Sequence, residues 1–273
     1  MADPRDSERA RVATGEELAA LLHYSDVRVL LAVLDNPALA DSDICVLLNR
    51  KTLPAKVVEE ICTRRAFLKT YAVKRALACH PRTPRLVTLR LLKDLYLMDL
   101  VQIALLPGIS AELKRSAEDQ LAARLPQLPL GQKITLARRG PSRVAGLLLA
   151  QGHPQVLAVA LDNTNLTSAQ ILRVLAQEGV PVAVVHAIAQ HPKWSCDYNV
   201  RLALVRNPAS TLTSVLAYLP DLTASDLNVL AEPGIVPDRL RNYLQAEVLR
   251  RVRAGKKIAA SGEPFYSDEP SKE

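Results

Sequence analysis

Residues 71–84 read YAVKRALACHPRTP, and residues 198–211 repeat the same pattern as YNVRLALVRNPAST. The same offset of about 127 positions places Leu34-Asp35-Asn36 on Leu161-Asp162-Asn163. Over residues 26–100, roughly 23 of about 75 aligned positions are identical, and a fixed long period is the mark of a repeat architecture. The sequence therefore predicts two tandem copies of one unit.

Proline signals between the apolar stretches predict helices along the chain. Pro54 and Pro181 suit the first turn of a helix, because the amide that proline lacks would be unpaired there. Both prolines precede buried stripes at helical spacing, namely Val57, Val58 and Ile61 in copy one and Val184, Val185 and Ile188 in copy two. No stretch alternates as a strand would, and we expect about fourteen to seventeen helices.

Pairs of such helices cannot bury their apolar faces alone, so each pair must stack on the next. We therefore predict an all-α fold, a right-handed α-solenoid that forms one domain over residues 14–253. The predicted boundaries are a flexible segment at 1–13, copy one at about 26–125, connecting helices at 126–152, copy two at about 153–252 and a disordered tail at 254–273.

The stretches 73–84 and 200–211 share a pattern that is also found in known repeat proteins. Each has a basic residue, an Ala-Leu or Leu-Ala-Leu core and then His or Asn before proline. This line resembles the repeats of bacterial leucine-rich-repeat-variant and HEAT-like proteins, and the resemblance implies an α-solenoid rather than a reaction. Some repeat-variant proteins carry an amino-terminal iron–sulfur cluster. This chain has no cysteine before Cys45, so the cluster is not expected here.

The composition predicts a core of many small contacts. Hydrophobic residues make up 49% of the chain and aromatic residues 4%, so closely spaced helices must fill the interior. No apolar run approaches the roughly eighteen residues that cross a bilayer, and no leader follows the charged residues 1–11. We expect a cytoplasmic protein that makes no membrane contact.

The cysteines and aspartates of the chain lack the spacing that metal sites and catalytic sites need. The four cysteines are Cys45, Cys62, Cys79 and Cys196. They do not form the paired spacing of a zinc or iron–sulfur site, which predicts reduced structural thiols. Asp94 with Asp99, and Asp221 with Asp226, are better explained by helix capping than by acid–base chemistry. Without metal, phosphate or nucleotide motifs, we expect neither cofactor nor enzymatic activity.

The candidate binding surface lies on the helix before each His-Pro or Asn-Pro stop. If Val73, Ala76 and Leu77 face the core, helical periodicity places Ala78 and several aromatic and basic residues on the opposite side. The candidate residues are Phe67, Tyr71, Lys74 and Arg75 in copy one, and Trp194, Tyr198 and Arg201 in copy two. Aromatic faces beside cations are suited to stacking a base and binding its phosphate. The alternative is that these aromatic residues fill the contact with the next helical pair.

These observations predict a non-enzymatic scaffold that binds a protein partner along its helical surface. Nucleic-acid or nucleotide binding through the basic-aromatic faces is the alternative, and the net charge of +7 with a pI near 9.3 is compatible with it. The position of the arginines and the exposure of Tyr71 and Tyr198 would distinguish the two.

Overall fold

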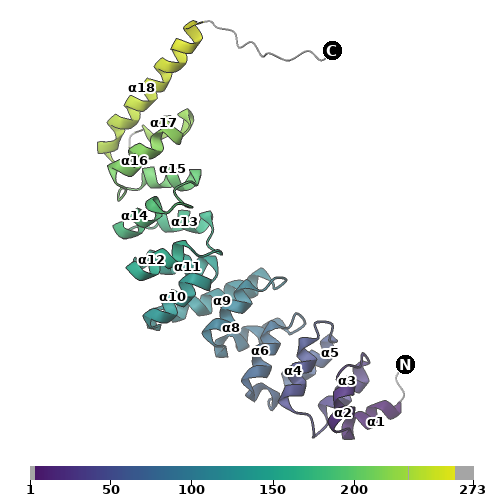
Figure 1. Cartoon of the computed structure of the whole chain (residues 1–273). Coiled ribbons are helices and arrows are strands. Elements are labelled where there is room, and N and C mark those ends of the chain that lie inside the picture. Colours follow the sequence, from purple (N-terminus) through teal and green to yellow (C-terminus); the bar gives the residue numbers. More distant parts are fainter. Residues whose placement is uncertain (1–3, 233, 262–273) are drawn as a thin grey trace, which may run out of the picture. The chain divides into compact units, whose positions relative to one another are not determined.

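All regular structure in the computed structural model is helical over the residues it describes, 4–232 and 234–261 (Figure 1). This described part contains eighteen α-helices, slightly more than the sequence predicted, and four short 3-10 helices. The chain divides into two compact units, Met1–Val144 and Ala145–Glu273. This differs from the single domain predicted for residues 14–253, because contacts cluster on each side of a boundary within the predicted connecting helices.

The first unit contains ten helices and three 3-10 turns. The α-helices are α1 Pro4–Val12, α2 Gly15–Leu21, α3 Val27–Leu34, α4 Asp41–Asn49, α5 Ala55–Thr63, α6 Tyr71–Cys79, α7 Arg85–Leu91, α8 Leu97–Leu105, α9 Ala111–Arg124 and α10 Leu130–Arg139. The 3-10 helices are η1 Phe67–Lys69, η2 Leu92–Asp94 and η3 Leu125–Gln127.

The second unit begins inside α11, which spans Ser142–Ala150. The following helices are α12 Pro154–Leu161, α13 Ser168–Leu175, α14 Val182–Gln190, α15 Tyr198–Arg206, α16 Leu212–Tyr218, α17 Ala224–Leu230 and α18 Asp238–Ser261, with the 3-10 helix η4 at Leu219–Asp221.

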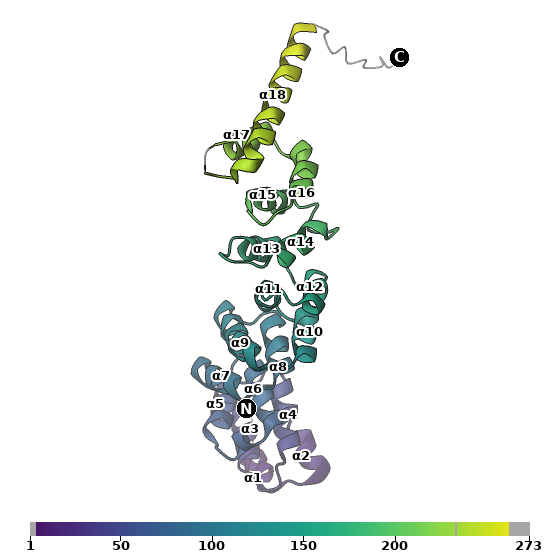
Figure 2. The same cartoon turned by 90° about the vertical axis from the view of Figure 1, so that its left-hand side faces the viewer.

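Within each unit, alternate helices pack side by side. In the first unit α1 contacts α3 and α3 contacts α5, while α4 contacts α6 and α6 contacts α8. In the second unit α12 contacts α14 and α13 contacts α15. Figure 2 shows α12, α14 and α16 along one side of this unit, with α13 and α15 on the other. Each helical pair thus covers the next, as in helical-repeat proteins.

Apolar residues at helical spacing form the core of both units. Val57, Val58 and Ile61 of α5 are fully buried, and so are Val184 and Ile188 of α14. The sequence prediction of these buried stripes is therefore confirmed. Pro54 and Pro181 take the cap position immediately before each helix, one residue earlier than expected. Proline fits this position because it has no amide hydrogen to leave unpaired.

Arginine side chains link one helical pair to the pair before it. Arg124 at the end of α9 donates to the carbonyl oxygen of Leu95 at 2.7 Å, and Arg251 in α18 donates to that of Leu222 at 2.6 Å. Both acceptors follow a 3-10 helix, where carbonyl groups have no partner in the helix itself. Each bond bridges 29 residues, so one helical pair is the spatial repeat.

The two ends of the chain differ from the sequence prediction. The flexible segment expected at 1–13 contains helix α1, and Ala10 and Ala13 are buried. Asn36 donates to the carbonyl oxygens of Ala10 (2.9 Å) and Ala13 (2.8 Å), which holds the end of this helix against α3. The disordered tail expected from residue 254 begins instead as the last turns of α18, and residues 262–273 lie outside the described residues.

Candidate functional site

The predicted site residues of copy one make contacts with the next helical pair. The Tyr71 hydroxyl donates to the Asp99 carboxylate and accepts from the Tyr96 amide at 2.9 Å. Its ring stacks on Tyr96 with a centroid distance of 4.1 Å. Burial, together with the hydrogen bond to Asp99, raises the pKa of Tyr71. This ring is therefore used in helix packing rather than presented as an open stacking surface.

The cations of copy one are neutralised by neighbouring carboxylates. Lys74 Nζ lies 2.7 Å from Asp94 Oδ2, and Arg75 Nε lies 2.9 Å from Asp99 Oδ1. Ala78, expected away from the core, is buried. Ala78 is buried because α6 packs on more than one side, against α4, α7 and α8. Phe67 in η1 is half-buried, with the Arg64 guanidinium 5.8 Å from its ring centre.

The residues of copy two repeat these roles. Tyr198 donates to Asp226 and accepts from the Thr223 amide at 3.1 Å, and Arg201 pairs with Asp221 at 2.7 Å. The hydrogen bond from Tyr198 is the main reason why the pKa of Asp226 is lowered. The four aspartates proposed for capping therefore serve as partners of tyrosine and cationic side chains between helical pairs.

Trp194 lies in the core and does not offer its ring to a ligand. Its side chain is 2% exposed, and its indole nitrogen donates to the Leu161 carbonyl oxygen at 2.9 Å. Tryptophan has one donor, so this single bond satisfies its polar group on burial. Of the two readings of the aromatic residues, the geometry of Trp194, Tyr71 and Tyr198 matches packing.

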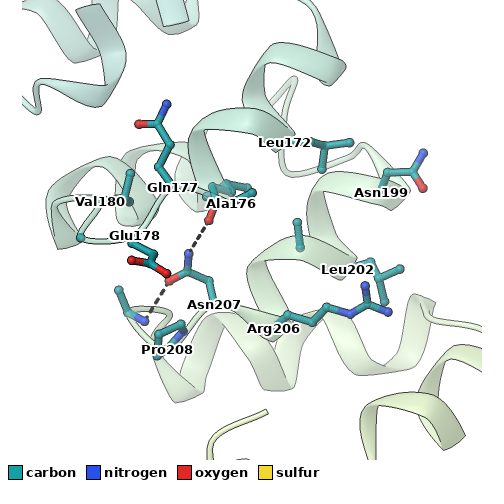
Figure 3. A pocket seen from close by; sticks show the side chains of 14 residues that line it. Leu172, Ala176, Gln177, Glu178, Val180, Asn199, Leu202, Arg206, Asn207 and Pro208 are labelled. Carbon is teal, nitrogen blue, oxygen red and sulfur yellow. Dashed lines mark hydrogen bonds between the residues drawn. The ribbon is translucent and has the colours of Figure 1, made fainter. Parts of the chain in front are cut away.

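A groove lies between α13 and α15, within the second unit (Figure 3). Its volume is about 780 Å³, in the range of sites that bind drug-sized ligands. The residues that line it are Leu172, Leu175, Ala176, Gln177, Glu178, Gly179, Val180, Asn199, Leu202, Ala203, Arg206, Asn207, Pro208 and Ala209. We refer to this feature as the α13–α15 groove.

One face of α15 forms a wall of the groove. Asn199, Leu202, Ala203 and Arg206 follow the spacing that places side chains on one side of a helix. Leu202 and Ala203 are half-buried, whereas Asn199 and Arg206 at the two ends are exposed. The helix thus presents an apolar centre between two polar ends.

Two positions in or beside α15 carry residues that differ from those found about 127 positions earlier in the chain. The position of Ala209 corresponds to Arg82, whose guanidinium donates to the Leu53 carbonyl oxygen at 3.0 Å. The position of Leu202 corresponds to Arg75, which pairs with Asp99. Alanine cannot reach across the space that an arginine spans, and leucine replaces a charge by apolar surface.

The rim of the groove carries one cation and one anion. Arg206 and Glu178 are both exposed, and Figure 3 shows them on either side of Asn207. Neither takes part in an ion pair within the described residues. The Asn207 carboxamide already makes two hydrogen bonds within the protein: it donates to the Leu175 carbonyl oxygen at 3.1 Å and accepts from the Ala209 amide at 2.9 Å.

Within the described residues, no group of three or more histidine, cysteine or acidic side chains could hold a metal ion. All four cysteines, which lie in this part of the chain, carry free thiols. None of its helices combines the length and apolar character needed to cross a bilayer. No family model, curated protein or solved structure matches the chain.

Proposed function

We propose that this chain is a non-enzymatic cytoplasmic scaffold that binds a protein partner in the α13–α15 groove. In this proposal the scaffold is a right-handed α-solenoid of the HEAT-like or repeat-variant type, with bacterial relatives, as the resemblance of its repeat line implies. The groove is the observation that carries the proposal, because a contiguous apolar surface with a polar rim is typical of an interaction site.

Recurring contacts support a tandem duplication of one unit. Several interactions are found at equivalent places in both halves. Among them are Tyr71 with Asp99 and Tyr198 with Asp226, Arg124 with Leu95 and Arg251 with Leu222, and Thr70 with Asp41 and Asp197 with Ser168. In the last of these, Thr70 corresponds to Asp197 and Asp41 corresponds to Ser168. The hydroxyl and the carboxylate have therefore exchanged places, while the hydrogen bond between the two positions remains. Preservation of a bond through such an exchange favours descent from one repeated unit over chance similarity.

The alternative of nucleic-acid binding is less favoured by the local electrostatics. Lys74, Arg75 and Arg201, the cations of the predicted basic-aromatic faces, are each paired with an aspartate. Phosphate binding gains its free energy from cations that exchange counterions for phosphate groups. Cations already paired with carboxylates would first have to give up those pairs.

Leu202→Arg tests the proposal, because it places in the groove the residue found at the equivalent position 75. Ala72→Arg is the matched control: it adds the same charge on α6, at the position equivalent to Asn199 but outside the groove. We expect full-length protein to recover a defined protein partner from its native cell, and Leu202→Arg to reduce that recovery about tenfold or more. Ala72→Arg should leave recovery unchanged.

Two results would contradict the scaffold proposal. One is equal recovery by wild type and folded Leu202→Arg, which would exclude the α13–α15 groove as the binding surface. The other is recovery of nucleic acid in place of protein, with binding that decreases steeply as salt increases. Far-UV circular dichroism and Trp194 fluorescence establish that each variant is folded.

A further inference from the structure

We propose that the α13–α15 groove binds a short extended segment of the partner, with apolar side chains between an acidic and a basic residue. The acidic residue faces Arg206 and the basic residue faces Glu178. This inference rests on the proposed scaffold function and specifies the chemistry of the partner.

The dimensions of the groove match a short segment rather than a folded domain. The face of α15 from Asn199 to Arg206 is about 10 Å long at the rise of an α-helix. About three residues of extended chain span that length. Because the floor lies between two helices, a folded domain would have to project a narrow element to reach it.

Apolar contact supplies the main driving force for binding. Leu172 of α13 and Leu202 of α15 are half-buried, and Leu175, which also lines the groove, is buried. Covering the exposed part of these side chains removes apolar surface from water. The partner segment is therefore expected to carry one or two side chains of the size of leucine or phenylalanine.

Charges at the rim determine which residues flank the apolar ones. Arg206 has no carboxylate within ion-pair distance among the described residues, although it is near enough to Asp226 to lower the pKa of that group. The net charge of +7 of the whole chain also favours approach of acidic groups. Glu178 makes the other side of the rim acidic, which favours a basic residue there and opposes a run of phosphates.

Carboxamide groups on the rim suit an extended backbone. Gln177 and Asn199 are exposed, and each carboxamide offers both a donor and an acceptor. An extended peptide presents unpaired N–H and C=O groups on its two edges. Figure 3 shows the Gln177 and Asn199 side chains at separate places around the groove.

Selection of random dodecapeptides displayed on phage, with the full-length protein as bait, tests this inference. Peptides that also bind Leu202→Arg are removed, and the remaining ones are sequenced. We expect enrichment of sequences in which large apolar residues lie between Asp or Glu on one side and Lys or Arg on the other. A synthetic copy of the best peptide then provides the probe for fluorescence anisotropy.

Charge exchange establishes the contact with Arg206. Replacing the acidic residue of the probe by lysine should weaken binding about tenfold, through loss of one ion pair and gain of repulsion. Arg206→Glu should restore binding of the lysine peptide and weaken that of the original peptide. Glu178→Lys should act in the same way on the basic residue of the probe, and Ala72→Arg should change affinity less than about twofold.

The outcomes separate this inference from the scaffold proposal. Groove-dependent peptides that lack charged flanks, or affinities that do not respond to Arg206→Glu, would overturn the partner chemistry but leave the scaffold function intact. A second outcome is that no enriched peptide binds wild type better than Leu202→Arg, although Leu202→Arg still abolishes recovery of a protein partner. This outcome would show that the occupant of the groove is not a short segment. If Leu202→Arg changes neither peptide binding nor recovery of a partner, both proposals are wrong.

Discussion

At the scale of single residues, polar side chains are used in pairs that cross from one helical pair to the next. A tyrosine hydroxyl such as that of Tyr71 both donates to a carboxylate and accepts from an amide, so it satisfies two groups at once. Arg124 donates through two guanidinium nitrogens to the carbonyl oxygens of Lys93 and Leu95, at 2.8 and 2.7 Å. A planar guanidinium can bind two separate acceptors, which a lysine ammonium does less well.

Thiol reactivity provides a prediction at this scale. Burial, with a smaller effect of Glu59, raises the pKa of Cys62 to about 11, and burial also raises the pKa of Cys45 and Cys79. Because the thiolate is the reactive form, these three thiols should react slowly at pH 8, whereas the exposed Cys196 should react fast. Timed reaction of the native protein with Ellman's reagent should show one fast thiol.

Variants assign that fast phase to a residue. Cys196→Ser should abolish it, and Cys62→Ser should leave it unchanged. A fast phase that persists in Cys196→Ser would contradict the slow reaction expected of the other three thiols.

At the scale of elements, α18 is attached to the second unit by its first turns. Leu240 and Leu244 are buried, and α18 packs against α17. Further along, Glu247 Oε1 lies 2.9 Å from Arg251 Nε, and Arg251 in turn reaches the Leu222 carbonyl oxygen at 2.6 Å. Arg250 also donates to Glu247 at 2.7 Å. The carboxylate therefore orients the guanidinium that connects the helix to η4.

The ionisation of Glu247 makes the stability of this attachment depend on pH. Hydrogen bonds from Arg250, and then from Arg251, lower its pKa from 4.5 to about 2. A lowered pKa in the folded state means that the contribution is complete above pH 4.5 and is lost as the pH falls towards 2. We expect the urea midpoint of Trp194 fluorescence to decrease over this range more in wild type than in Glu247→Gln.

The control for this measurement is Glu16→Gln, an exposed carboxylate of α2 in the other unit. Its midpoint should follow that of wild type across the same range. Parallel curves for wild type and Glu247→Gln would mean that Glu247 does not stabilise the folded state through its charge.

At the scale of the whole molecule, the chain consists of two compact units, and the boundary between them in the sequence falls within α11. Equivalent leucines lie in their cores: Leu77 in α6 and Leu204 in α15 are both fully buried. The single tryptophan, Trp194, belongs to the second unit, so its fluorescence reports the folding of that unit. This arrangement allows the stability of each unit to be perturbed and observed separately.

Truncation of these leucines tests whether the units unfold independently. Each of Leu77→Ala and Leu204→Ala should lower the free energy of unfolding of its own unit by about 3 kcal/mol, because a cavity remains where the side chain was. In urea titrations Leu204→Ala should shift the fluorescence transition, and Leu77→Ala should shift only part of the circular dichroism transition. Equal shifts of fluorescence in both variants would instead indicate one cooperative unit.

Local sequence patterns predicted the helices well, because helix formation and termination depend on residues within a few positions of each other. The stripe Val57, Val58 and Ile61 in α5 and the stripe Val184, Val185 and Ile188 in α14 are examples, since all six side chains are buried. The amino-terminal helix was missed because its residues are mostly polar. Its order depends on Asn36, a residue 23 to 26 positions away.

The sequence by itself determined an all-helical repeat, because the period of apolar residues and the prolines that stop each helix are local signals. Only the tertiary structure decided which side chains remain available to a partner. Tyr71 and Tyr198 meet carboxylates 28 positions away, and Trp194 meets a carbonyl 33 positions away. The groove beside α15 opens where Ala209 replaces an arginine that bridges to the preceding pair in the other half. Such distances are set by packing of one helical pair on the next, which no local pattern encodes.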